Sequence, residues 1–228
     1  MKSFVVEFWS RVFDILRWVS VFEPVRRVFP CLKTHGIVDV WVMSNLVLAI
    51  IAAAVAPSIW LGWVQVLLVA YGLLRVFEIL VYQVNVLLFD EYRAKKASKQ
   101  YALRGYRRLV ILLLQNYVEI IFWFASIYIV LKSGFEFKTP GTADTFFGGV
   151  YSSFITMTTF GEPNIAPKAS WGAMLIFFQS GTGLFMTLLS LARFISLIPT
   201  PESSDEFEIK QGRSNKQLNR TRQKQRAG

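Results

Sequence analysis

Four long apolar stretches divide the chain, and each one is long enough to form a helix that crosses a membrane. They cover about residues 38–56, 59–89, 109–131 and 171–198. A helix needs about 20 consecutive apolar residues to cross the roughly 30 Å of hydrocarbon in a bilayer. Pro57 and Ser58 leave room only for a tight reversal between the first two stretches. The pattern therefore predicts an all-α integral membrane protein with four transmembrane helices.

A segment of mixed polarity separates the third stretch from the fourth. Residues 142–159 read TADTFFGGVYSSFITMTT, and a helix of about a dozen residues is too short to cross a bilayer. We expect a re-entrant helix here. Non-helical backbone at membrane depth is tolerated only where it is buried in protein or lines water, so the TFGEP turn that follows should line an aqueous path. Threonine hydroxyls, and backbone carbonyls that Gly161 can turn inward, suit a cation.

The first residues of the chain are amphipathic rather than continuously apolar. Residues 4–19 place apolar side chains at helical spacing and charged side chains on the opposite face. Their Trp, Phe and Arg content favours a helix in the headgroup layer, although packing against a neighbouring helix explains the same periodicity. Because charged residues interrupt the stretch, we expect no cleavable signal peptide. We assign residues 1–36 to this cytoplasmic N-terminal segment.

The distribution of charge predicts an orientation in the membrane. The chain has 25 Lys and Arg against 15 Asp and Glu, a formal net charge of +10, although 54% of its residues are hydrophobic. Most of the positive charge lies in the N-terminal region, the loop 90–108 and the tail 199–228, whereas 132–170 is balanced. Because positively charged loops stay inside, we expect both termini and this loop to be cytoplasmic. The TFGEP turn then faces outside, in a multi-pass protein of the plasma or cell membrane.

Composition and residue types also restrict the partners. Lys and Arg lie between apolar runs rather than on one folded polar surface, which argues against nucleic-acid binding. We expect the tail 199–228 to be disordered, with its basic half either attracted to anionic lipid or simply solvated. Cys31 and His35 have no partners at metal-ligand spacing, so we expect no bound cofactor. The sequence has no Ser-His-Asp set or phosphate-binding loop, and we expect no enzymatic activity.

Polar residues inside the apolar stretches are few and come in pairs. Arg75 and Glu78 lie three residues apart on one helix face, where each can neutralise the other in a medium that penalises lone charges. We favour a structural role for this pair over gating or lipid contact. Asn116 and Glu119 have the same spacing in the third stretch, and we expect them to find a partner in a neighbouring helix or subunit.

Residues around the turn resemble those of a known family. Thr158-Thr159-Phe160-Gly161 takes the place of the potassium-channel T-T-V-G. The sequence APKASWG (166–172) resembles the family's stretch from filter to inner helix, and Gly183 falls at its inner-helix hinge glycine. On these residues, about 109–197 looks like the pore module of tetrameric pore-loop cation channels. The resemblance implies a homotetramer in which 109–198 forms outer helix, pore helix, filter and inner helix. Residues 37–89 then form a peripheral pair, joined to the pore by the loop 90–108.

The turn also departs from the potassium-channel pattern. Potassium channels continue Y-G-D after the first glycine, whereas this chain has Glu162-Pro163-Asn164. Pro163 is fixed near φ −65° and cannot copy the second glycine, so we expect the outer potassium sites to be lost. TTFGEP is instead similar to the T-T-I-G-E-T-P of cyclic-nucleotide-gated channels, without the Thr after the glutamate. That resemblance implies a lower filter at Thr158, Thr159, Phe160 and Gly161, an outer ring at Glu162, and weak discrimination between K⁺ and Na⁺.

A ring of glutamates has physical consequences of its own. Four copies of Glu162 around an axis attract cations and can hold Ca²⁺ through hard oxygen ligands. Their mutual repulsion is expected to raise the pKa values of the coupled set. Divalent ions and protons should then both reduce the monovalent current.

Gating and two rival functions stay open. Gly181 and Gly183 are candidate bending points of the inner helix, and small-residue packing explains them equally well. Neither of the first two apolar stretches carries Arg at every third position, so we expect no voltage sensor of the usual kind. We expect no cyclic-nucleotide-binding domain, because the roughly thirty mostly polar residues given after Pro199 are too few to fold into one. The rivals are a potassium-selective channel and a non-conducting auxiliary membrane subunit.

Overall fold

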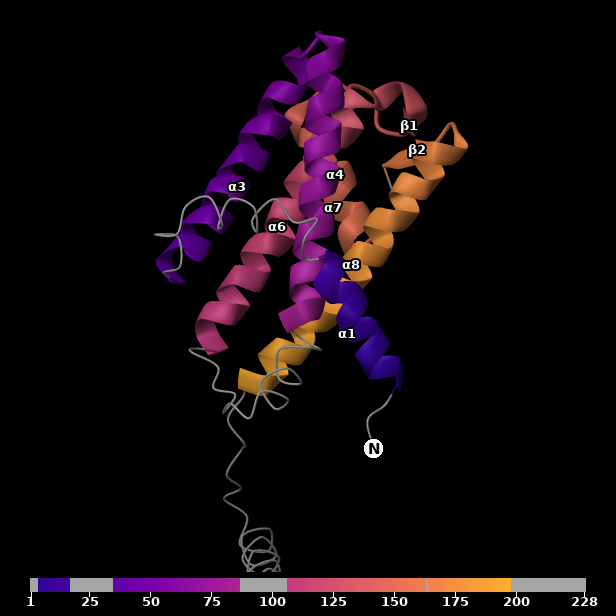
Figure 1. Ribbon diagram of the computed structural model, residues 1–228. Coiled ribbons are helices and arrows are strands. Elements are labelled where there is room, and N and C mark those ends of the chain that lie inside the picture. Colours follow the sequence, from indigo (N-terminus) through magenta and orange to yellow (C-terminus); the bar gives the residue numbers. More distant parts are fainter. Residues whose placement is uncertain (1–3, 17–34, 87–105, 163, 198–228) are drawn as a thin grey trace, which may run out of the picture. The chain divides into compact units, whose positions relative to one another are not determined.

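The computed structural model describes residues 4–16, 35–86, 106–162 and 164–197, and most of them are helical. Four helices are long and apolar enough to cross a membrane. They are α3 (His35–Val55), α4 (Gly62–Val84), α6 (Tyr106–Val130) and α8 (Ser170–Leu197) (Figure 1). The shorter helices are α1 (Phe4–Leu16), α7 (Phe146–Thr158), η3 (Ala56–Ser58) and η5 (Lys132–Gly134). The prediction of a mostly helical membrane protein with four candidate spans is confirmed.

The boundaries of the helices follow local backbone geometry. Pro57 lies in the first turn of η3, which makes the tight reversal that the sequence predicts. The next helix begins at Gly62, three residues later than the apolar stretch, because Ile59 and Leu61 are extended, with ψ angles of 111° and 112°. Residues 4–16 of the predicted amphipathic segment form α1. The rest of that segment, the loop up to residue 105 and the tail 198–228 lie outside the described residues.

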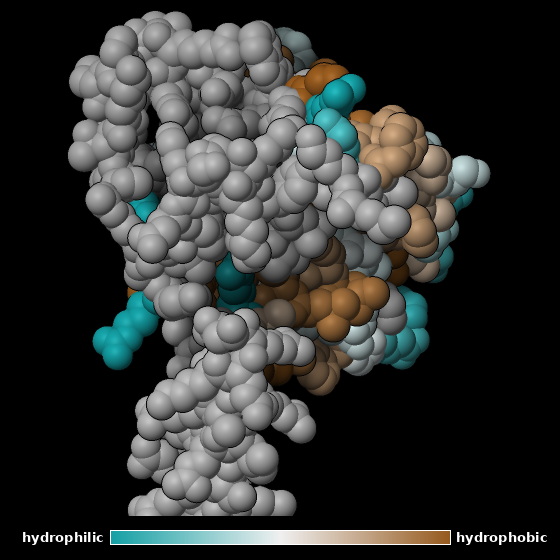
Figure 2. Space-filling model, turned by 60° about the horizontal axis from the view of Figure 1, so that its bottom comes forward, coloured by the Kyte–Doolittle hydropathy of each residue, from teal (hydrophilic) through white to brown (hydrophobic). Residues whose placement is uncertain are grey.

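The core of the protein surrounds α6. About 67% of its apolar stretch is buried, against 33% for α4 and 28% each for α3 and α8. Helices α3, α4 and α7 all pack on α6, and its Trp123, Phe124 and Tyr128 are almost completely buried. The other long helices keep apolar side chains at the surface, and Figure 2 shows such hydrophobic surface among the described residues. This is the distribution expected of helices that face lipid on one side and protein on the other.

Small residues on α7 bring it close to α6. A Cβ atom at Gly149 would lie 2.6 Å from Cδ1 of Ile129 and 3.0 Å from the carbonyl oxygen of Ala125. Ser153, one turn further along, donates from Oγ to the carbonyl oxygen of Ile121 over 2.7 Å. Side chains no larger than these let two helix backbones approach closely, as in membrane helix pairs generally.

Two short strands flank α7, and the sequence pattern does not predict them. Strand β1 (Phe135–Phe137) pairs antiparallel with β2 (Ile165–Pro167), with Phe137 opposite Ile165. The all-α prediction is therefore wrong in this detail, because three residues are too few to produce a recognisable alternation. The ladder ties the segment before α7 to the segment after it.

Candidate functional site

The predicted filter residues form one continuous turn at the end of α7. Thr145 caps the start of α7, because its Oγ1 accepts from the backbone N–H of Gly148 over 3.1 Å. It ends because Thr159 has left-handed geometry, with φ 57° and ψ 20°, and Gly161 follows with φ 93°. A threonine in the left-handed region costs about 1–3 kcal/mol, so surrounding contacts must hold it there. The strained backbone and the predicted filter thus coincide.

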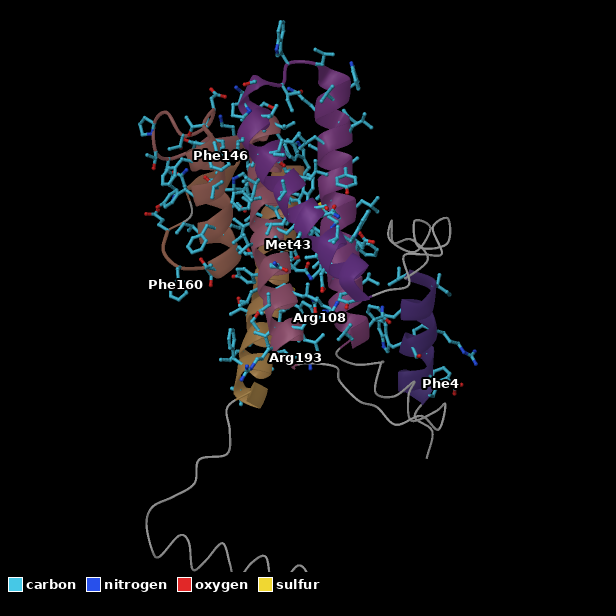
Figure 3. The ribbon with its side chains drawn as sticks, turned by 90° about the vertical axis from the view of Figure 1, so that its left-hand side faces the viewer. Phe4, Met43, Arg108, Phe146, Phe160 and Arg193 are labelled. Carbon is cyan, nitrogen blue, oxygen red and sulfur yellow. The ribbon has the colours of Figure 1, made fainter. Side chains whose placement is uncertain are left out.

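One side of this turn is exposed in the single chain. Residues 159–162 are exposed, and the exposed fraction of Phe160 is 77%. Figure 3 shows Phe160 pointing away from the helices. The threonine hydroxyls bond locally: Thr158 Oγ1 donates to the carbonyl oxygen of Phe154 over 2.8 Å. Thr159 Oγ1 donates to the carbonyl oxygen of Thr158 over 2.6 Å. The turn therefore lies at an open surface, with its threonine hydroxyls bonded to nearby carbonyl oxygens of the same chain.

Asn164 fixes the far end of the turn and is not among the site residues that the sequence pattern predicts. Its side chain is buried, and Nδ2 donates to Ser152 Oγ over 2.9 Å and to Thr142 Oγ1 over 3.2 Å. Its Oδ1 accepts from the backbone N–H of Thr139 over 3.1 Å. The chain thus returns to the start of α7 after the turn. The only available sign in the sequence was an amide placed directly between the turn and an apolar residue.

Gln179 on α8 forms a second buried anchor that sequence reasoning missed. Its Nε2 donates to the carbonyl oxygen of Ser153 over 3.0 Å and to Ser153 Oγ over 2.8 Å. The hydroxyl of Tyr128 donates to Gln179 Oε1. These bonds join α6, α7 and α8 behind the turn. A glutamine inside an apolar stretch was the only sign of this network, because its partners are 26 and 51 residues away.

The two candidate hinge glycines of α8, Gly181 and Gly183, have different surroundings. A Cβ atom at Gly183 would lie 2.0 Å from the carbonyl oxygen of Met157, at the end of α7, whereas Gly181 has open space. Gly183 therefore allows a close crossing of two backbones, which favours the packing interpretation at that position. Helix α8 is continuous through both residues, and bending at either one stays a prediction.

Glu162 has an ion-pair partner within its own chain. The ammonium of Lys138, which directly follows β1, contacts Glu162 Oε1, and both side chains are substantially exposed. This hydrogen bond and charge lower the pKa of Glu162. The direction is opposite to the one expected for four repelling glutamates, because a single chain supplies one carboxylate and one adjacent cation. The described residues contain no group of three His, Cys, Asp or Glu that could hold a metal ion.

The two polar pairs of the apolar stretches meet in one cluster. Arg75 Nη1 lies 2.7 Å from Glu78 Oε2, which confirms that predicted pair. Arg75 Nε also lies 2.6 Å from Glu119 Oε1, and Nη2 lies 3.2 Å from Glu119 Oε2. Trp123 Nε1 donates to Glu119 over 3.2 Å. Glu119 therefore finds its expected partner on a neighbouring helix, whereas Oδ1 of buried Asn116 has no hydrogen-bond partner among the described residues.

No protein-family model, curated protein or solved structure matches the chain. Its function is therefore inferred from the residues themselves and from their geometry. Two features are most informative for that purpose: the exposed turn from Thr158 to Glu162, and the buried anchors that hold this turn from behind.

Proposed function

We propose that this chain is one subunit of a homotetrameric cation channel that passes K⁺ and Na⁺ with weak selectivity. The observation that carries the proposal is the polar turn from Thr158 to Glu162. It follows a short helix, has positive φ at Thr159 and Gly161, and is exposed from Thr159 to Glu162. Its other side is held by Asn164 and the network of Gln179. In the proposed tetramer, the carbonyl oxygens of four such turns line one axis as a selectivity filter.

The segment around α7 enters the membrane and returns to the same side. The 13 residues of α7 rise by about 20 Å, which is less than the roughly 30 Å of hydrocarbon. Thr142 before the helix and Asn164 after the turn are hydrogen-bonded to each other, so both ends of the segment lie together. By the positive-inside rule, this side is the outer one and both chain termini are cytoplasmic.

Several copies are required because one chain lines only one side of a path. Polar backbone at membrane depth must face protein or water, and the open side of the turn faces neither in a single chain in lipid. Around a fourfold axis, four such turns share one aqueous path. Helix α8 serves as inner helix and α6 as outer helix, while α3 and α4 pack on α6 as the peripheral pair.

The chemistry of the turn favours weak selectivity. Carbonyl and hydroxyl oxygens from Thr158 to Gly161 replace part of the hydration shell of a monovalent cation. Pro163 stands where a potassium-channel filter has its second glycine, and its fixed φ prevents the same outer carbonyl arrangement. Glu162 supplies the outer site, where carboxylates from four subunits bind Ca²⁺ through oxygen ligands and hinder monovalent current.

The proposal is tested by current through the purified chain in planar bilayers under opposed K⁺ and Na⁺ gradients, with and without external Ca²⁺. A reversal potential near zero, with Ca²⁺ block relieved by Glu162→Gln, supports it. Glu136→Gln is the matched control, because Glu136 is another exposed carboxylate that lies on β1. A reversal at the potassium potential identifies the potassium-selective rival. Silence of folded protein in every condition favours the auxiliary-subunit rival or a gating stimulus that the bilayer does not supply.

A further inference from the structure

Lys138 is held beside the outer end of the turn by the backbone. The register of β1 and β2 places Phe137 opposite Ile165. Lys138, which follows β1, therefore lies beside Asn164, which precedes β2. The backbone N–H of Lys138 donates to the carbonyl oxygen of Asn164 over 2.8 Å. From this anchored position its side chain reaches Glu162, two residues before Asn164. The proximity of the two charges is therefore set by the ladder rather than by chance contact of two surface side chains.

The other charged residues of this region do not contact Glu162. Lys132 pairs with Asp144, and Glu136 and Lys168 lie in and beside the strands. The segment 132–170 contains three Lys and three acidic residues. Each Glu162 thus comes with one cation of its own, and a ring of four such pairs has little net charge.

We propose that Lys138 is a tethered counter-cation of Glu162 that competes with divalent ions for the outer site. This inference rests on the proposed channel function. To coordinate a ring of four carboxylates, Ca²⁺ must displace the ammonium groups and approach against their charge. A lysine ammonium is a compact charge on a flexible stem, so displacement is feasible but costs part of the binding free energy. Lys138 therefore sets how strongly divalent ions block the path.

The experiment measures the Ca²⁺ concentration that halves the monovalent current for the native chain, Lys138→Gln and Lys138→Arg. We expect Lys138→Gln to lower this concentration about tenfold, as four exposed ion pairs act on one site. Lys138→Arg keeps the charge and should stay within about twofold of the native value. Lys132→Gln removes an equal charge from the same region without touching Glu162, so the half-blocking concentration should not change.

Two outcomes separate this inference from the channel proposal. An unchanged half-blocking concentration in Lys138→Gln, in protein that conducts, overturns the role of Lys138 and leaves the channel intact. When the native chain does not conduct, calorimetric Ca²⁺ binding to the tetramer in nanodiscs takes the place of current. If Lys138→Gln binds Ca²⁺ more tightly than the native chain and Glu162→Gln abolishes the binding, the competition is supported even without current. Equal Ca²⁺ affinity of the native chain and Lys138→Gln overturns it.

Discussion

The side-chain amide of Gln179 on α8 donates to the carbonyl oxygen of Ser153 on α7 over 3.0 Å, and both residues are completely buried. The other bonds of this amide go to Ser153 Oγ and to the hydroxyl of Tyr128. A polar group surrounded by apolar side chains is costly unless its donors and acceptors are paired. Gln179 therefore fixes the position of α7 and, through it, the position of the polar turn.

Gln179→Leu should destabilise the protein by about 1–3 kcal/mol, because it leaves Tyr128 and Ser153 with unpaired buried groups. Thermal unfolding of the protein in nanodiscs measures this loss. Gln115→Leu is the matched control, since Gln115 is only half-buried and its amide bonds a sulfur atom, Sδ of Met43. A larger loss in the control than in Gln179→Leu would contradict the anchoring role.

Asn164→Ala should loosen the turn, because three side-chain hydrogen bonds are lost at once. We expect a loss of about 1–3 kcal/mol in unfolding free energy and a change in the relative permeability of K⁺ and Na⁺. Ser152→Ala removes only one bond to the same amide and should have a smaller effect on both quantities. Native permeability ratios in Asn164→Ala would show that the turn does not depend on this anchor.

Gly183→Ala and Gly181→Ala should differ although they lie two residues apart. A methyl group at 183 would overlap the carbonyl oxygen of Met157 at 2.0 Å, whereas position 181 is open. Overpacking of this kind costs about 1–3 kcal/mol, while alanine in an open helical position stabilises by up to about 1 kcal/mol. Thermal unfolding of the two variants measures both effects. Equal melting temperatures would argue against the close crossing of α7 and α8.

Arg75→Met should be the most damaging of these substitutions. It leaves Glu78 and Glu119 buried without their shared cation, and breaking a buried pair from one side costs about 3–5 kcal/mol. Arg108→Met is the matched control, because the pair of Arg108 with Asp39 is partly exposed and such pairs contribute about 0–1 kcal/mol.

Glu78→Gln provides an internal check on the same cluster. The guanidinium of Arg75 keeps its two-point contact with Glu119 in this variant, so one cation still faces one carboxylate. We expect a much smaller loss of stability than in Arg75→Met, measured by unfolding in the same nanodiscs. A loss as large as that of Arg75→Met would mean that Arg75 depends on Glu78 rather than on Glu119.

The sequence alone predicts features that a periodicity or a length imposes. The thickness of a bilayer sets the length of the four long helices, and helical spacing brings Arg75 beside Glu78. Glycine and proline in the turn indicate where α7 must end. Contacts between distant residues have no such pattern: Arg75 meets Glu119 from 44 residues away, and Gln179 meets Ser153 from 26. The two short strands were not predicted for the same reason, because each forms only by pairing with the other, which lies far away in the sequence.

The ladder of β1 and β2 joins the two ends of the segment that contains α7 and the polar turn. The segment from Thr139 to Asn164 is joined to the rest of the molecule through this ladder, through the packing of α7 on α6, and through the buried amides of Asn164 and Gln179. Such a segment opens as one cooperative unit rather than residue by residue. Amides of α7 and of the two strands should therefore show similar protection against hydrogen exchange. One substitution in the ladder should lower this protection along the whole segment.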